Sequence, residues 1–306
     1  MRPLPAVAAH AARHDGLITR SQALDAGISE SALRQAIRRG GPWQRVAPGV
    51  YAVFTGALTE RQRLRAALLV AGPGAILSGA EACRTHGMRY VPKNQPVLVL
   101  VPHVRRAAVS SLVVLRRVVV LPEPRTLRGL PFAHVERAVV DTLCHSPSSR
   151  PRPSLHDTRA LVCESVQRRL TTPERLGAEL DRAPRNGTAL LRRAVEDVTA
   201  GRWSAPECET LDVIRSSLIM PEPQINTPLP DLEDITPDGW WLEARLAYEV
   251  DSDEHHRYGL SGTDPATPGT RGQCRLAGHA DLAVARALQA AGASSRDGSV
   301  IPARPR

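Results

Sequence analysis

Apolar residues recur at helical spacing through the first 38 residues and then give way to short alternating runs. The spacing predicts three helices, over residues 6–14, 21–26 and 30–38, followed by two strands around Pro48-Gly49. Three short helices and a hairpin are typical of a winged helix-turn-helix, which we place over residues 1–56.

A second pattern covers residues 57–145 and indicates a small α/β domain. A helix is expected over 61–70 and a shorter one after Leu77-Ser78. Valine-rich runs then predict strands, at residues 97–101, 112–115 and 118–121. Three polar residues in this domain have no partner at ligand spacing, so we expect structural roles for them: His103, His134 and Asp141.

Residues 146–200 are predicted to form a linker and a basic helical bridge. The linker is the Pro/Ser/Arg-rich piece 146–154. Helices are expected over 155–167, 172–180 and 185–200, with Thr171 or Thr172 capping the second. Arginines are frequent here and could lead DNA toward the downstream part of the chain.

The acidic region 201–260 contains the clearest candidate chemistry. Residues from Ala244 to Asp251 alternate as in a strand, which places Glu249 and Asp251 on one face. A two-residue turn at Glu243-Ala244 would bring Asp238 opposite Glu249, with Cβ atoms about 5 Å apart. Crowded carboxylates repel one another unless a hard cation binds them, so the pattern favours a divalent metal site. The alternative is a solvent-exposed face of an edge hairpin.

Glu207 is a further acidic candidate at the start of this region. The sequence Ser204-Ala205-Pro206-Glu207 predicts a capping box that opens a helix. Downstream of residue 256 the composition changes to Gly, Ala, Pro and Thr, with no β-branched run. We therefore expect residues 261–306 to be a disordered tail and the preceding sheet to lack its last strand.

Composition and charge refine this division. The 306 residues leave room for two or three domains. The net charge of +9 is distributed as +3 over residues 1–60, +12 over 61–200 and −6 over 201–306. A basic front and an acidic rear fit attraction to phosphate in one part and metal binding in the other, although solvated arginines would give the same totals.

Cysteine usage and hydropathy exclude several classes of protein. The five cysteines form no Cys-x-x-Cys pair, so neither a zinc ribbon nor a disulfide framework is indicated. No apolar run approaches the ~18 residues of a membrane span, and His10, Arg13 and His14 interrupt any signal core. We expect a cytoplasmic protein without a membrane partner.

The expected third helix presents polar groups that can reach phosphates or guanine edges in double-stranded DNA. These candidates for DNA binding are Arg34, Gln35, Arg38 and Arg39. A winged helix that serves only as a protein-interaction module is the alternative.

Three motifs at the N-terminus resemble the N-terminal domain of AbiEi-type antitoxins. They are Gly16-Leu17-Ile18-Thr19, the turn Gly27-Ile28-Ser29 and the closing Gly49-Val50-Tyr51. The resemblance implies binding to promoter DNA and a toxin as a possible partner. Gly129-Leu130-Pro131-Phe132 with the helix after it is similar to the second domain of these proteins.

The acidic region resembles the PD-(D/E)XK nuclease superfamily, in its branch related to very-short-patch repair endonucleases. The matching pieces are Pro237-Asp238, Glu249-Val250-Asp251 and His255-His256, with Ser204 to Glu207 upstream. Asp251 stands where the most familiar form of the superfamily has lysine. The chain as a whole is thus expected to be mixed α/β, ending in a restriction-endonuclease-like domain that is incomplete.

This resemblance implies metal-assisted hydrolysis of a phosphodiester. Mg²⁺ would be held by Asp238, Glu249 and Asp251, with Glu207 able to reach the cluster, and a histidine would shuttle the proton. The two candidate histidines are His255 and His256. Two alternatives are open: zinc bound by these histidines and a carboxylate, or a transcriptional regulator or antitoxin whose nuclease fold is inactive.

Overall fold

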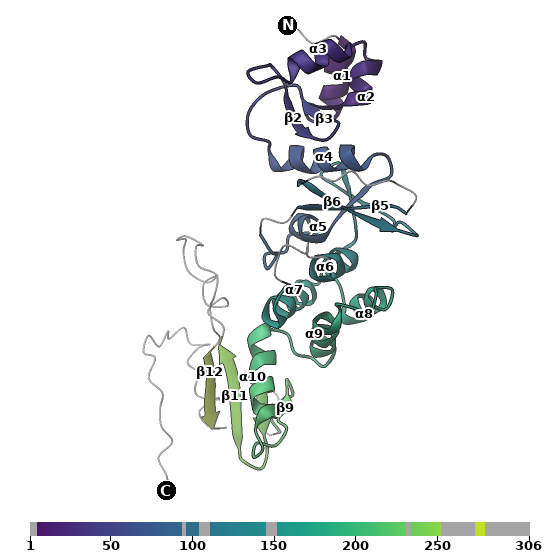
Figure 1. Ribbon diagram of the computed structural model, residues 1–306. Coiled ribbons are helices and arrows are strands. Elements are labelled where there is room, and N and C mark those ends of the chain that lie inside the picture. Colours follow the sequence, from purple (N-terminus) through teal and green to yellow (C-terminus); the bar gives the residue numbers. More distant parts are fainter. Residues whose placement is uncertain are drawn as a thin grey trace. The chain divides into compact units, whose positions relative to one another are not determined.

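The computed structural model of the chain describes residues 5–93, 96–103, 111–144, 152–230, 234–251 and 273–278. The chain divides into two compact units, Met1–Thr199 and Ala200–Arg306, and helices and strands occur in both (Figure 1). The expected mixed α/β class is therefore confirmed. Within the described ranges, no helix is long and apolar enough to cross a membrane.

The N-terminal part of the first unit has three helices and a three-stranded sheet. Its strands are antiparallel in the order β1-β3-β2. The elements are α1 (Pro5–Arg13), β1 (Leu17–Thr19), α2 (Arg20–Asp25), α3 (Glu30–Ala36), β2 (Gln44–Ala47) and β3 (Val50–Ala52). The three expected helices and the expected hairpin are present, whereas β1 was not expected. Three residues between two helices carry too little pattern to indicate a strand.

A five-stranded mixed sheet follows, in the order β6-β5-β4-β8-β7. Strand β5 pairs in parallel with β6, and β4 in parallel with β8, whereas β4–β5 and β7–β8 are antiparallel. The elements are α4 (Glu60–Ala71), β4 (Ile76–Ser78), α5 (Gly79–Thr85), β5 (Val97–Pro102), β6 (Val113–Val118), β7 (Arg125–Leu127), β8 (Leu130–Phe132) and α6 (Val135–Cys144).

The prediction of one strand in this domain is wrong. Residues 118–121 do not form a separate strand, because Val118 ends β6 and the next two valines face solvent. Val119 is 84% exposed and Val120 is 79% exposed. Pro122 and Pro124 follow, and proline cannot donate to a strand ladder. High β-propensity alone does not make a strand where no neighbour offers a partner edge.

Three helices complete the first unit and share its largest core. They are α7 (Leu155–Gln167), α8 (Pro173–Asp181) and α9 (Ala189–Thr199). Ser154 caps α7 and Thr172 caps α8 through hydroxyl groups that accept backbone N–H bonds. Helix α9 begins four residues later than expected, after the turn that contains Asn186-Gly187. Apolar residues of all three helices pack against those of the sheet and α6: Leu77, Val139, Leu161, Leu176 and Leu191.

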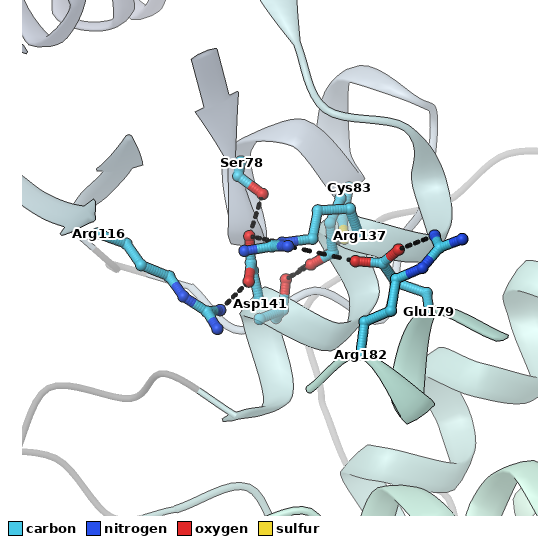
Figure 2. A network of polar contacts seen from close by, with 9 residues as sticks. Ser78, Cys83, Arg116, Arg137, Asp141, Glu179 and Arg182 are labelled. Carbon is cyan, nitrogen blue, oxygen red and sulfur yellow. Dashed lines mark hydrogen bonds and ion pairs between the residues drawn. The ribbon is translucent and has the colours of Figure 1, made fainter. Parts of the chain in front are cut away.

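A buried polar network ties this unit together (Figure 2). The Asp141 carboxylate accepts hydrogen bonds from Ser78 Oγ at 2.6 Å and from Arg137 Nε at 2.9 Å, and Arg116 pairs with its other oxygen. Arg137 also donates to Glu179 at 3.3 Å. The network connects β4, β6, α6 and α8, which confirms the structural role expected for Asp141.

The second unit packs a helix against an antiparallel sheet in the order β12-β11-β10-β9. Its elements are α10 (Ala205–Ser216), β9 (Gln224–Ile225), β10 (Gly239–Trp241), β11 (Leu246–Asp251) and β12 (Gln273–Gly278). Ile214 of α10 packs on Trp241 and Tyr248, whose ring centroids lie 5.6 Å apart.

Strand β12 corrects one expectation about the tail. We expected no strand after residue 260, yet residues 273–278 pair with β11 along its whole length. The open edge of β11 presents backbone donors and acceptors that a neighbouring segment can satisfy whatever its side chains. Composition therefore did not reveal this strand. The other residues of the segment 261–306 lie outside the described part of the chain.

Candidate nucleic-acid interface

Helix α3 is short and has defined ends. The Ser29 hydroxyl caps it by accepting from the Ala32 N–H at 3.2 Å, as the sequence predicts. At the other end, the Trp43 N–H donates to the Ala36 carbonyl at 3.0 Å and Gly41 N–H to Arg38 O at 2.8 Å. A side chain at Gly41 would collide with the Ala36 carbonyl oxygen. The chain thus turns tightly after Ala36.

This turn corrects the placement of two predicted site residues. Arg34 and Gln35 lie on α3 and are exposed. Arg38 and Arg39 were expected on the same helix, but they lie in the turn that follows it, also exposed. The predicted helix was too long, because Arg38 and Arg39 are as compatible with the end of a helix as with a turn. All four side chains still belong to one short segment.

The charge balance around α3 leaves these arginines without carboxylate partners. Within the described residues, no hydrogen bond or ion pair engages the side chains of Arg34, Arg38 and Arg39. Two of the acidic groups in this part of the chain are paired elsewhere, Glu30 with Arg20 and Asp15 with two arginines of α4. Within the described residues, the charge of the arginines on and after α3 is not neutralised by an ion pair.

Asp15 shows how this separation of charge arises. Its carboxylate accepts from Arg61 Nε at 2.8 Å and from Arg65 Nε at 3.0 Å. Partial burial alone would raise the pKa of Asp15, but the bonds from Arg61 and Arg65 outweigh it and lower the pKa overall. The Gln62 side chain donates to the Asp15 carbonyl at 3.0 Å. Asp15 is thus committed to α4 and does not neutralise α3.

Arg45 is another exposed arginine, and sequence reasoning did not single it out. It lies on β2, one strand of the hairpin that follows α3. The side chain has no hydrogen-bond or carboxylate partner in the described ranges. Gln44 beside it holds the strand to the following loop through bonds to Gly56 at 2.7 and 3.3 Å. Its place in the hairpin predicted around Pro48-Gly49 was the available signal.

The predicted acidic site lies in the second unit, and the structure confirms the predicted register. Gly239 pairs with Tyr248 and Trp241 with Leu246, and continuing this register by one residue places Asp238 opposite Glu249. The Val250 N–H donates to Asp238 Oδ2 at 2.6 Å, so this carboxylate reaches across to β11.

Glu207 has a structural partner at the first turn of α10. Its backbone N–H donates to Ser204 Oγ at 3.2 Å, as the capping box predicts, and its carboxylate accepts from Trp203 N–H at 3.0 Å. The side chain of Asp251 lies outside the described part of the chain, as do His255 and His256. Among the described side chains no three His, Cys, Asp or Glu groups are placed to hold a metal ion. The metal site therefore stays a prediction.

Comparison with known proteins gives a family match for the N-terminal part of the chain. Residues 5–53 match the model of a family described as "Transcriptional regulator, AbiEi antitoxin". A search of curated proteins finds no match. A crystal structure of the RV2827C protein from Mycobacterium tuberculosis is similar over 63% of this chain and 79% of that chain, with 20% identity and a TM-score of 0.40. At that level of similarity we infer neither fold nor function from it.

Proposed function

We propose that the chain is a DNA-binding transcriptional regulator of the AbiEi antitoxin type. The proposal rests on one observation above all: exposed arginines at the end of α3 lack carboxylate partners in the described residues, in a segment that matches a regulator family. Guanidinium groups in that state pair readily with phosphates and release condensed counterions. On the helix itself, Gln35 would contact base edges in the major groove, and Arg34 would contact a phosphate beside them.

A salt titration tests this proposal. The double variant Arg34→Ala, Arg38→Ala should bind a DNA duplex more weakly, and the slope of log K against log salt should fall by about 1.8, since each lost phosphate contact lowers it by about 0.9. The matched control is Arg117→Ala, Arg245→Asn, which removes the same charge from exposed positions outside both the winged helix and the basic helical bridge. Equal slopes for the two double variants would refute the interface.

A toxin is the second partner that the family description supports. We propose that this regulator also neutralises a toxin, because the matched family model is described as an antitoxin. Expression of a neighbouring growth-arresting gene product with and without this chain tests the idea. Growth arrest that this chain never relieves would reject it.

A second candidate activity, metal-dependent phosphodiester hydrolysis, is favoured by the pairing of Asp238 with Glu249. Both are hard oxygen donors of the kind that Mg²⁺ prefers, and the bond from Val250 N–H orients the Asp238 carboxylate across the hairpin. When bound, the ion would supply charge stabilisation and a more acidic water. Asp238 and Glu249 would hold such an ion, with Asp251 as the further ligand that the resemblance implies.

A thermal shift measurement tests the metal site. Mg²⁺ or Mn²⁺ should raise the Tm of the wild type by binding the folded state. The gain should vanish in Asp238→Asn, whose amide oxygen still accepts from Val250 N–H but is a poorer ligand. The control Glu243→Gln removes an exposed charge from the turn of the same hairpin and should keep the gain. A Tm indifferent to metal in all three proteins would reject the site.

A further inference from the structure

The β7–β8 hairpin carries an arginine at an unfavourable position in its turn. Leu127 pairs with Leu130, so Arg128 and Gly129 form a two-residue turn, and both have positive φ, 49° and 71°. Turns of this type favour Asn-Gly or Asp-Gly. A residue with a Cβ is disfavoured in the left-handed region, because the Cβ approaches the following carbonyl oxygen. The arginine is therefore not explained by the conformation of the turn.

Helix α4 links the tip of this hairpin to the winged helix. Arg61 of α4 donates through Nη1 to the Arg128 carbonyl and through Nε to Asp15 at 2.8 Å. Asp15 immediately precedes the winged-helix sheet and also binds Arg65. The tip is thus tied to the N-terminal domain through the backbone of Arg128. Its side chain remains exposed, without a hydrogen-bond or carboxylate partner in the described residues.

The contacts of Arg61 bring this tip near Asp15, at the end of the N-terminal sheet to which the arginines after α3 also lead. Ala52 of β3 pairs with Leu17 of β1 on one side and with Gln44 of β2 on the other. The starts of β1 and β2 therefore lie at the same end of the sheet, on either side of β3 and about 10 Å apart. Asp15 leads into β1, and the turn with Arg38 leads into β2. Figure 1 shows α4 between the winged helix and the mixed sheet.

We propose that Arg128 is a second phosphate contact, by which the mixed α/β domain adds to the DNA footprint of the winged helix. The inference rests on the proposed function, because it takes the same duplex as ligand. Arg128 contributes backbone affinity and orientation rather than sequence specificity. The link from Arg128 through Arg61 to Asp15 fixes the spacing between the two contacts.

The variant Arg128→Asn separates binding from folding. Asparagine tolerates positive φ, and the Arg128 carbonyl that Arg61 binds is kept, so the Tm should stay the same or rise. Loss of one phosphate contact should lower the salt slope by about 0.9, which corresponds to roughly fivefold weaker binding near 0.15 M salt. Arg245→Asn is the matched control, because it removes one charge from another exposed turn residue with a φ of 49°, outside this hairpin.

The outcomes distinguish this inference from the function on which it rests. If the Arg34, Arg38 double variant lowers the slope and Arg128→Asn leaves both slope and affinity at the wild-type values, the second contact is overturned and the regulator stands. If the wild type shows no salt-dependent binding to a duplex that carries its own promoter region, both fail. An equal loss in Arg128→Asn and Arg245→Asn would also overturn the inference, because it would show a diffuse charge effect.

Discussion

Replacing Asp141 with alanine should unfold the first unit at a markedly lower temperature. Its carboxylate is fully buried and holds Arg116 and Arg137, whose side chains are only 17% and 16% exposed. Burial lowers the pKa of Arg116, and of the charges around it Asp141 does most to oppose that shift. Truncating one partner of such a buried set leaves the other charges uncompensated, which costs about 3–5 kcal/mol.

That cost is large against the total stability of a domain, about 5–15 kcal/mol. For a unit of this size each kcal/mol shifts the Tm by about 2–4 °C, so Asp141→Ala should lower it by roughly 6–20 °C. Ser78→Ala removes only the neutral donor of the same network and should cost about 1 kcal/mol. Calorimetry or circular dichroism measures both. If Asp141→Ala lowers the Tm no more than Ser78→Ala does, the charge of the Asp141 carboxylate is not what stabilises the network, and this reasoning is refuted.

Two further predictions concern the junction at Asp15 and the second sheet. The pKa of Asp15 is lowered in the folded protein, so its stabilisation is complete above the unfolded value of 3.8 and is lost as the pH falls below it. The Tm difference between wild type and Asp15→Asn should accordingly stay constant above about pH 5 and shrink as the pH falls below 3.8, and a difference that does not change at low pH would contradict the assignment. Gly239→Ala should destabilise the second unit by about 1–3 kcal/mol, because the new Cβ would overlap the Tyr248 ring. Unchanged tryptophan fluorescence and Tm would show that the ring moves aside freely.

The elements that sequence reasoning found are those with strong local signals. Helices α3, α7 and α8 begin at hydroxyl caps, at Ser29, Ser154 and Thr172, and periodic apolar residues follow each of them. Strands β1 and β4 were missed because each has three residues and is defined by partners far along the chain. A pattern of three residues is too short to predict pairing with a strand far along the chain.

The candidate site was predictable to the same extent. Exposed arginines near α3 follow from sequence, since their charge is visible there. The sequence does not show which acidic side chains pair with which arginines. Arg61 and Arg128 are 67 residues apart, yet one binds the backbone of the other. Only the folded chain shows that Asp15 is occupied by α4 and that the hairpin tip lies beside it.

The register of the second hairpin, in contrast, follows from side-chain size rather than from its turn. The turn Leu242–Arg245 lacks glycine, and Arg245 adopts a φ of 49°. The strands nevertheless align, because Trp240 and Ala247 face one core while Trp241 and Tyr248 face the other. Gly239 alone leaves room for the Tyr248 ring, so a slip by one residue would set that ring against a side chain and exchange both faces. The opposition of Asp238 and Glu249 is therefore a consequence of packing, and it would persist whether or not a metal binds there.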